Sequence, residues 1–408
     1  MSLSPAAEIS TPASGRPTAT LSRASLALFA LALGSFVIGT SEFASMGVLQ
    51  LYAADLGLSA PQATAAITAY AIGVVVGAPL VTLVAARANR RLVLLGLMAL
   101  FVVGNLLSSI ASNLGWLMIA RFVSGMPHGA YFGAGAVIAS YVMGPGHGGK
   151  AFAMVMSGLT VATIFGSPLA TLMGQMLGWR QTYVAVAGVG LLAFLAIRTW
   201  TPRTDALNGA SVTRELSSLR KPAVWGVMLV AATGVAAIFA VYTFIGQLVT
   251  EVAGLSSTMI PVALALFGLG MTSGNIVGGA LADRRPAWGI ALGYAGALAV
   301  LAVLAIGGAS VWILFPALFG VGAAIMVAIP GIQVRLTSLA PEAPSLMGAM
   351  NLAALNVANA LGAWLGGMTI AAGFGVLSTV WAGFALTSTG LLVLGVTLMI
   401  HRLPKKGI

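Results

Sequence analysis

The chain alternates between long apolar stretches and short polar connections. Twelve of the apolar stretches reach the length of about 20 residues that an α-helix needs to cross a bilayer. They cover residues 24–52, 61–86, 92–112, 115–143, 151–177, 181–201, 223–250, 258–282, 287–307, 310–336, 345–371 and 375–401. Transmembrane strands would instead appear as short segments of alternating polarity. The pattern therefore predicts an all-α membrane protein with twelve transmembrane helices.

One connection is longer and more polar than the others. Residues 202–222 contain charges of both signs and divide the chain into two halves of six spans, which is an internal duplication of layout. The first residues are rich in Ser, Thr, Ala and Pro, so we expect them to be disordered. The predicted organisation is a disordered cytoplasmic N-terminus (1–23), a six-helix bundle (24–201), a cytoplasmic linker (202–222), a second six-helix bundle (223–401) and a cytoplasmic tail (402–408).

The composition supports a membrane location. Hydrophobic residues make up 59% of the chain and charged residues only 7%, whereas roughly a quarter of the residues in a soluble domain are charged. The mean hydropathy is +1.03. The chain has no cysteine, which excludes disulfides, thiolate metal sites and cysteine nucleophiles.

The net charge of +11 is explained by topology. If the N-terminus is cytoplasmic, all but two of the 19 Lys and Arg residues lie on the cytoplasmic side, as the positive-inside rule requires. The two exceptions are Arg180, in an outer loop, and Arg121, inside the fourth span. The charge pattern thus predicts a multi-pass protein of a bacterial inner membrane, with both termini cytoplasmic and no nucleic-acid partner.

One carboxylate lies well inside a span. Glu42 stands in the stretch VIGTSEFASMG (37–47) of the first span, where a charged side chain costs about 2.5–3.5 kcal/mol on insertion scales. At 1.5 Å per residue, Glu42 and Arg121 both fall in the outer half of the membrane. They form a structural ion pair between the first and fourth spans, or Glu42 binds and releases a proton beside Arg121, or Glu42 binds substrate directly. These interpretations are compatible with one another.

Other polar and aromatic residues within the spans are weaker candidates. His128 either titrates near neutral pH during proton coupling or is a hydrogen-bonded packing residue. A second set either lines a polar substrate cavity with aromatic walls or simply bridges helices. This set comprises Tyr70, Tyr131, Tyr242, Phe244, Gln247, Asn275, Asn351, Asn356 and Asn359.

Small residues recur at every fourth position in spans 2, 5, 8 and 11. Such stripes let helices pack closely in lipid. Because they fall on equivalent spans of both halves, we expect these four helices to touch across the interface between the halves. Representative members are Gly73 and Gly77, Gly158 and Gly166, Gly270 and Gly274, and Gly362 and Gly366.

The stretch GPGHGGKA (144–151) nearly matches a phosphate-binding loop. It lacks the Ser or Thr that would follow the lysine, because Ala151 stands there, and a membrane span precedes it instead of a strand. No metal-ligand cluster or nucleophile motif stands out in the sequence. We therefore expect neither a cofactor nor enzymatic activity, and we expect the protein to use a secondary energy source.

Several motifs of the chain resemble those of the major facilitator superfamily, in its twelve-span drug:proton antiporter branch. GGALADRRP (278–286) is similar to the second-half copy of the family's loop motif. The first-half copy, TLVAARANRR (82–91), has Ala86 in place of the aspartate. The resemblance implies two pseudo-symmetric six-helix bundles. It also implies a cytoplasmic gate formed by Arg87, Arg90, Arg91, Asp283 and Arg284.

Two further motifs resemble those of exporters. RFVSGMPHGA (121–130) is similar to the span 4 motif whose arginine, here Arg121, is associated with proton coupling. GLTVATIFGSPLATLMG (158–174) resembles the span 5 antiporter motif, with Ser167 inserted before the proline. Its positions are Gly158, Gly166, Pro168 and Gly174. Together with GTSEF, these motifs are similar to a subgroup that includes arabinose-efflux-type proteins and chloramphenicol exporters.

The resemblance implies a proton-coupled transporter that exports a small molecule by alternating access. The substrate would be a drug such as chloramphenicol, or a sugar or other metabolite. We expect a monomer in the bilayer whose partners are this substrate and protons. One alternative is uptake of a sugar or nucleoside by proton symport or uniport, which the span 5 motif disfavours. Another is a transport-inactive membrane sensor or scaffold, for which the soluble segments are short.

Overall fold

The structure is a computed structural model that describes residues 18–84, 87–144, 147–207 and 217–402. Within these ranges the chain forms helices joined by turns, and no β-strand. The first helix begins at Thr18, so it extends into the segment that we expected to be disordered. Residues 1–17 and 403–408, most of the two predicted tails, lie outside the described residues, as do 208–216 of the linker and Ala86.

The first half contains six spans, three of which are built from more than one helical segment. Span 1 is α1 with the short α2, span 4 is α5 with α6, and span 5 joins α7 to α8 through the π-helical segment η1. The bounds are α1 (Thr18–Gly47), α2 (Leu49–Asp55), α3 (Ala60–Val84), α4 (Arg90–Ser109), α5 (Leu114–Gly125), α6 (Pro127–Met143), α7 (Gly148–Val161), η1 (Ala162–Gly166), α8 (Ser167–Leu177) and α9 (Trp179–Trp200).

The second half repeats this layout, and its first span is again segmented. Short 3-10 segments, η2 (Asp205–Leu207) and η3 (Ser217–Arg220), lie in the linker. The remaining bounds are α11 (Pro222–Gly234), α12 (Ala236–Tyr242), α13 (Ile245–Gln247), η4 (Leu248–Val252), η5 (Ser257–Met259), α14 (Ile260–Ala282), α15 (Pro286–Gly307), α16 (Val311–Leu339), α17 (Pro344–Ala371) and α18 (Ser378–Arg402).

The predicted twelve spans are confirmed. Among the described residues, 11 helices are long and apolar enough to cross a membrane. The fourth predicted span is α5 followed by α6, which meet at Met126, so neither piece reaches that length alone. Pro127 explains the division, because proline cannot donate the backbone hydrogen bond that a continuous helix requires.

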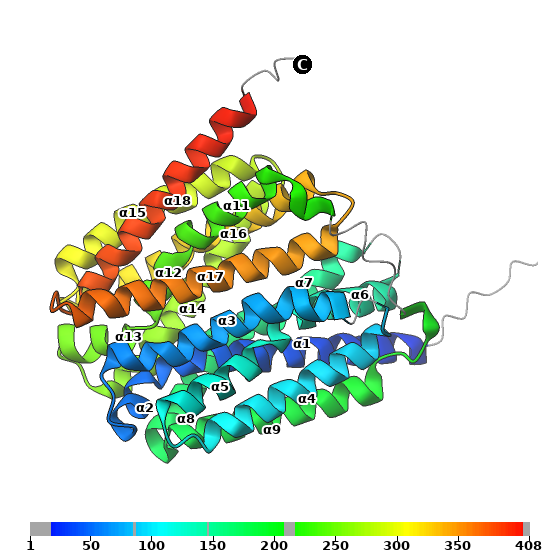
Figure 1. The fold of residues 1–408 in the computed structure, drawn as a ribbon, viewed down its shortest axis with the longest axis horizontal. Coiled ribbons are helices and arrows are strands. Elements are labelled where there is room, and N and C mark those ends of the chain that lie inside the picture. Colours follow the sequence, from blue (N-terminus) through cyan, green and yellow to red (C-terminus); the bar gives the residue numbers. More distant parts are fainter. Residues whose placement is uncertain (1–17, 85–86, 145–146, 208–216, 403–408) are drawn as a thin grey trace, which may run out of the picture.

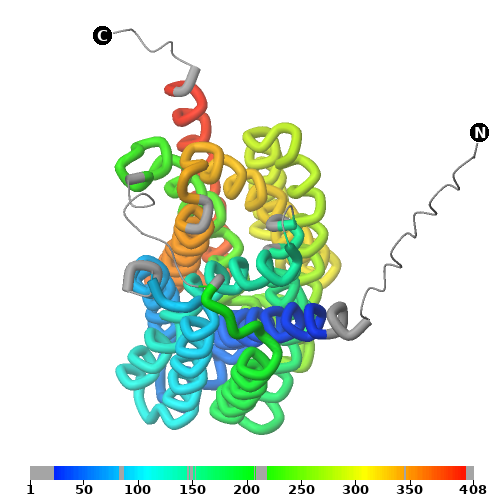
Figure 2. The backbone as a smooth tube through the Cα atoms, turned by 90° about the vertical axis from the view of Figure 1, so that its right-hand side faces the viewer, coloured from blue at the N-terminus to red at the C-terminus, as the bar shows by residue number. Residues whose placement is uncertain are grey.

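The two halves lie against each other along four helices. Figure 1 shows α3 beside α17 where the first half (blue to green) meets the second (green to red), and these two helices are in extensive contact. On the other side of the interface, α14 contacts η1 and α8. Figure 2 shows the two groups of helices nearly end on. Buried side chains at this interface therefore come from both halves.

The stripe on span 2 packs within its own half, and the stripe on span 8 does the same. A side chain at Gly73 of α3 would meet the backbone carbonyl of Phe122 in α5. A side chain at Gly274 of α14 would likewise meet the carbonyl of Ala323 in α16. Span 2 therefore rests on span 4 as span 8 rests on span 10, which is the same packing in each half.

The stripes on spans 5 and 11 also pack within their halves. Gly158 lies against the carbonyl of Ala32 in α1, and Gly362 against that of Ala236 in α12. The expectation that these four helices touch across the interface is confirmed, since α3 contacts α17 and α14 contacts η1 and α8. The glycines of the stripes, however, face neighbours within their own half. Four-residue spacing shows that one helix face is small enough for close packing, but it does not show which neighbour that face contacts.

Candidate proton and substrate site

Glu42 is buried at the interface between the two halves. It lies in the last two turns of α1 with only 5% of its surface exposed. Asn359 of α17, which is fully buried, donates a hydrogen bond from Nδ2 to Oε1 of Glu42 over 3.0 Å. This bond joins positions 317 residues apart in the sequence. The carboxylate of the first half is thus held by an amide of the second.

His128 approaches the same carboxylate from a third helix. It lies in the first turn of α6, just after the break in span 4, and is 2% exposed. Its Nδ1 is 3.8 Å from Oε2 of Glu42 and 3.0 Å from the hydroxyl of Tyr70 in α3. Tyr70, His128, Glu42 and Asn359 therefore form a buried polar cluster contributed by four helices. This cluster can hold a proton and exchange it among neighbouring groups.

Arg121 is buried beside this cluster but bonds to a different residue of α1. Its guanidinium donates to Oγ of Ser41 over 3.0 Å and to the carbonyl of Ser41 over 3.1 Å. The guanidinium carbon also lies 4.4 Å from the ring centre of Tyr70 and 5.3 Å from that of Tyr183. The Ser41 hydroxyl in turn donates to Asn105 in α4 over 2.8 Å. Cation–π contacts and these hydrogen bonds stabilise the buried charge.

The structural ion pair between Glu42 and Arg121 is not formed in this structure. Among the described residues, three carboxylates lie within pairing distance of a basic group, and these groups belong to His128, Arg180 and Lys221. None of the described carboxylates pairs with Arg121. Ser41 and Glu42 are successive residues of a helix and so point about 100° apart. Ser41 faces α5, and Glu42 faces α6 and α17. Arg121 is therefore a near neighbour of Glu42 without a direct contact.

The other predicted cavity residues are spread more widely. Tyr131 donates to the carbonyl of Leu31 over 2.9 Å and so links α6 to α1 within the first half. The hydroxyls of Tyr242 and Ser167 lie 2.9 Å apart across the interface between the halves. The Tyr242 ring also packs on Phe43, with 5.1 Å between centroids. Among these residues, Tyr242 alone borders the neighbourhood of Glu42.

The remaining amides differ in burial. Asn275 of α14 is exposed, whereas the other predicted amides are buried. Asn351 donates to Gln333 over 2.8 Å and Asn356 to the carbonyl of Leu352 over 3.0 Å. Within the described part of the chain, four buried amide oxygens accept no hydrogen bond, in Gln247, Asn351, Asn356 and Asn359. Phe244 is buried against Gly366 of α17.

Unpaired buried oxygens are unusual, because nearly all buried polar groups in proteins have a partner. Three of the four lie on α17, at positions 351, 356 and 359. This helix therefore presents acceptors that a hydroxyl or amide donor of a bound molecule can satisfy. In the described ranges, no group of three or more His, Asp or Glu side chains is arranged to hold a metal ion.

The antiporter-motif residues serve helix packing in this structure. Gly158 faces Ala32, Gly166 faces Thr40, and Gly174 faces Val48 at the end of span 1. Pro168 lies in the first turn of α8, directly after the π-helical segment η1. A proline lacks the backbone donor of a regular turn, and π-helical turns accommodate such interruptions. The motif therefore brings the bent span 5 close to the helix that carries Glu42.

The predicted gate residues lie at one end of the helix bundle, where arginines such as Arg91, Arg198 and Arg284 gather. We call this the basic end. Arg87, Asp283 and Arg284 are exposed. Arg91 is buried and donates to the carbonyl of Arg198 at the end of α9. Among the described residues, no ion pair connects the two loop motifs in this conformation. Their role as a gate, together with that of Arg90, remains a prediction.

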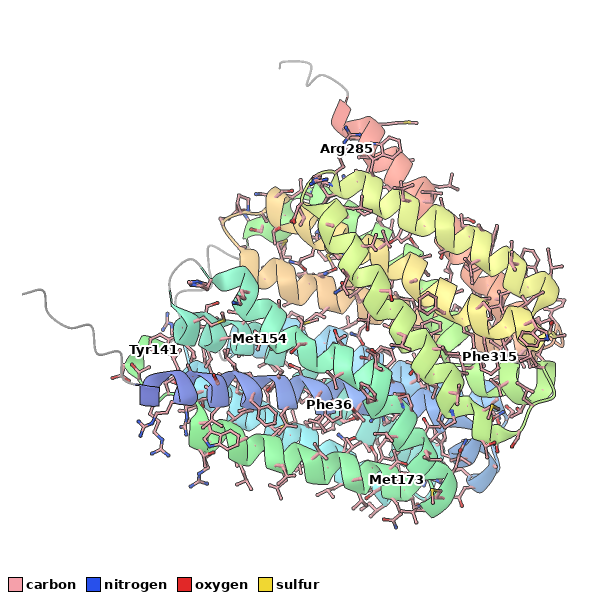
Figure 3. All side chains as sticks on the ribbon, turned by 180° about the vertical axis from the view of Figure 1, so that it is seen from behind. Phe36, Tyr141, Met154, Met173, Arg285 and Phe315 are labelled. Atoms are coloured by element: carbon pink, nitrogen blue, oxygen red, sulfur yellow. The ribbon has the colours of Figure 1, made fainter. Side chains whose placement is uncertain are left out.

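The halves are joined by hydrogen bonds at the opposite end. Gln50 donates to Thr250 over 3.3 Å, and Gln175 donates to the carbonyl of Ser257 over 2.8 Å. Toward the basic end, α7 and α14 diverge, as Figure 3 shows from η1 out to Met154 and Arg285. The two halves are thus in contact at the end opposite the basic residues and separate along this pair of helices at the basic end.

Three residues of the site escaped the sequence analysis. Ser41 stands next to Glu42 in the same short stretch, but its role depends on the direction in which each side chain points. Asn105 is the single amide within α4, which is a signal that could have identified it. Tyr183 carries no distinctive motif and was not identifiable.

A bundle of twelve spans in two similar halves, with buried polar groups where the halves meet, defines a membrane transporter. The family model described as Major Facilitator Superfamily matches residues 31–363. The chain belongs to this superfamily, and it is a multi-pass secondary transporter rather than an enzyme.

Several relatives match along most of their length. The inner membrane transport protein YdhP of Escherichia coli O157:H7 is 38% identical over 375 residues, covering 88% of this chain and 94% of YdhP. The putative transporter AraJ of E. coli K12 is 34% identical over 348 residues, with 85% and 88% covered. The chloramphenicol resistance protein of Streptomyces lividans is 34% identical over 372 residues, with 90% and 95% covered.

A solved structure shows the same fold. The crystal structure of a bacterial homolog of the human lysosomal transporter Spinster, inward-facing and occupied, aligns with a TM-score of 0.74 at 15% identity. The alignment covers 92% of this chain and 97% of that one. This likeness confirms the predicted fold class.

Proposed function

We propose that the protein is a proton-coupled exporter of a small molecule in a bacterial inner membrane, with both termini cytoplasmic and acting as a monomer. The observation that carries the proposal is the position of Glu42. Its carboxylate is buried, is bound by Asn359 of the other half and lies 3.8 Å from His128. A proton that binds at this position changes a contact between the two halves.

The chemistry of a carboxyl group gives the direction of this effect. An ionised carboxylate only accepts hydrogen bonds, whereas a protonated carboxyl also donates one. The charge-assisted bond from Asn359 is therefore strongest when Glu42 is ionised. Protonation weakens the link between α1 and α17 and favours the state in which the outer ends of the halves separate. Deprotonation toward the cytoplasm restores the link.

The buried amides of α17 support an uncharged substrate with hydrogen-bond donors. The free oxygens of Asn351, Asn356 and Asn359 accept hydrogen bonds, and the nearby aromatic rings contribute apolar surface. Phenicols and sugars both carry hydroxyl donors. The names of two relatives support such compounds as substrates. One is the chloramphenicol resistance protein, and the other is a probable sugar efflux transporter of Helicobacter acinonychis, which is 27% identical over 367 residues.

The proposal can be tested in inverted membrane vesicles with an acidic lumen. Phenicols and sugars are added one at a time while a pH-sensitive dye reports the lumenal pH. An exporter releases lumenal protons when its substrate is added, and Glu42→Gln should abolish this release. The matched control is Glu251→Gln, which changes an exposed carboxylate of η4 and should leave the response intact.

Two outcomes would contradict the proposal. Proton release by Glu42→Gln equal to that of the wild type would show that this carboxylate is not the coupling group. Substrate movement without any proton release, or inward uptake by intact cells, would favour a uniporter or symporter instead.

A further inference from the structure

A second cavity lies far from Glu42, at the basic end of the first half. The ends of α1, α6 and α9 enclose a cavity of about 810 Å³. Its lining includes Arg23 and Leu26 of α1, Tyr141 of α6, and Thr199 and Trp200 of α9. Figure 3 shows Tyr141 close to the start of α1. Neither the proton site nor the interface between the halves contributes to it.

The cavity adjoins a lipid-facing apolar surface. Leu26, Phe29 and Trp200 are 39%, 57% and 39% exposed. The rings of Phe29 and Trp200 pack together with 6.3 Å between their centroids. Tryptophan side chains such as that of Trp200 concentrate at the level of the lipid headgroups. One side of the cavity is therefore flanked by surface suited to acyl chains.

The surroundings of the cavity are strongly basic. Arg23 is exposed, and within the described part of the chain it forms no ion pair or hydrogen bond. Arg198 and Arg203 flank the lining segment Thr199–Pro202 and lie close enough for their charges to act on Arg91. Asp205 is exposed three residues beyond this segment, yet it pairs with none of these described arginines. The excess positive charge thus has no counter-ion among the described residues.

Hydrogen-bond donors remain free inside the cavity. The hydroxyls of Thr199 and Thr201 donate to carbonyls of their own helix. Tyr141 is exposed and makes no hydrogen bond to any described residue. The guanidinium of Arg23 and the hydroxyl of Tyr141 are therefore the donors available to a ligand, and guanidinium groups match the geometry of phosphate oxygens.

We propose that this cavity binds the phosphate headgroup of an anionic phospholipid. Arg23 and Tyr141 hold the phosphate, and the acyl chains run along Leu26, Phe29 and Trp200. Basic pockets between transmembrane helices bind such headgroups in other membrane proteins. The apolar flank favours a lipid over a soluble phosphate, because a soluble anion gains nothing from exposed aromatic rings.

Native mass spectrometry of the purified full-length protein tests this proposal. Protein from nanodiscs of phosphatidylcholine with phosphatidylglycerol is released into the gas phase, and retained lipid is counted. We expect the wild type to retain phosphatidylglycerol preferentially. Arg23→Gln should reduce that preference by about fivefold, the effect of one basic residue at an anionic surface, and Arg23→Lys should retain part of it. The matched control, Arg220→Gln, removes an exposed charge from the linker and should change nothing.

Trp200 provides an independent readout. Brominated phosphatidylglycerol should quench the component of tryptophan fluorescence that is absent in Trp200→Phe more strongly than brominated phosphatidylcholine does at the same mole fraction. Equal losses in Arg23→Gln and Arg220→Gln would show general surface attraction and overturn the proposal. Displacement of the retained lipid by excess inorganic phosphate would assign the cavity to a soluble anion and would overturn it as well.

Discussion

Gly274 provides a sharp test of how the second half is packed. It lies in the middle of α14, where a Cβ atom would meet the carbonyl group of Ala323 in α16. The Cβ would be only 2.7 Å from the carbonyl carbon and 2.9 Å from the Cα atom of that residue. These are backbone atoms, so no side-chain rotation can relieve the contact. Gly274→Ala must therefore move the two helices apart.

The size of the effect follows from these distances. Carbon atoms pack at about 3.5–4.0 Å, so the helices must separate by on the order of 1 Å. Overpacking of this kind destabilises the folded protein by roughly 1–3 kcal/mol. The higher helix propensity of alanine offsets this by up to about 1 kcal/mol. We expect a net destabilisation of about 1–2 kcal/mol. For a domain of the size of one half, each kcal/mol corresponds to about 2–4 °C in Tm.

Gly279 is the matched control on the same helix. A Cβ there would have no atom within 4 Å, so Gly279→Ala gains helix propensity without a clash and should raise Tm slightly. The measurement is the temperature at which each detergent-solubilised variant loses its monodisperse peak in size-exclusion chromatography. A Gly274→Ala variant as stable as Gly279→Ala would refute the close approach of α14 and α16.

Two further predictions concern other parts of the molecule. Asn359→Leu removes the donor to Glu42, a charge-assisted bond worth about 1.5–3 kcal/mol. Substrate-induced proton release should fall at least tenfold. It should fall less in Asn356→Leu, because the Asn356 amide donates its hydrogen bond to the Leu352 carbonyl of its own helix. At the end opposite the basic residues, hydrogen bonds from Arg180, and then from Trp179, hold the pKa of Asp55 below its usual range. The pair therefore contributes stability above the ordinary pKa of Asp, about 3.9, and loses it as the pH falls through the lowered value. Acid-induced loss of stability should be smaller in Arg180→Gln, by less than about 0.5 kcal/mol, because both partners are well exposed.

The spans and the buried charges were predictable because lipid imposes simple rules. An apolar run of fixed length, and basic residues confined to one side, follow from the energetics of the bilayer alone. The same rules singled out Glu42 and Arg121, since a charge inside a span is rare. The division of span 4 was less evident, although Pro127 and its neighbouring glycines could have indicated it.

The partners of these residues were not predictable in the same way. Asn359 was one of nine residues in the predicted cavity set, and nothing in its local sequence distinguished it from Asn356, only three positions away. On a helix, three positions move a side chain by about 300°. A small rotation of α17 would therefore decide which of the two reaches Glu42. Similarly, Ser41 and Glu42 exchange roles if α1 rotates by one residue, so the pairing of Arg121 depended on the packed structure.

The hydrogen bonds between the halves place a constraint on how the halves can move. The bonds of Gln50, Gln175 and Tyr242 lie at the end opposite the basic residues or near the middle, together with the bond between Glu42 and Asn359. Any motion that opens this end must break them all, and the first three are hydrogen bonds between neutral groups, worth about 0.5–1.5 kcal/mol each. The bond to Glu42 is the one whose strength depends on a proton. Under the proposed function, it is therefore the one bond of the four through which a proton gradient biases the opening.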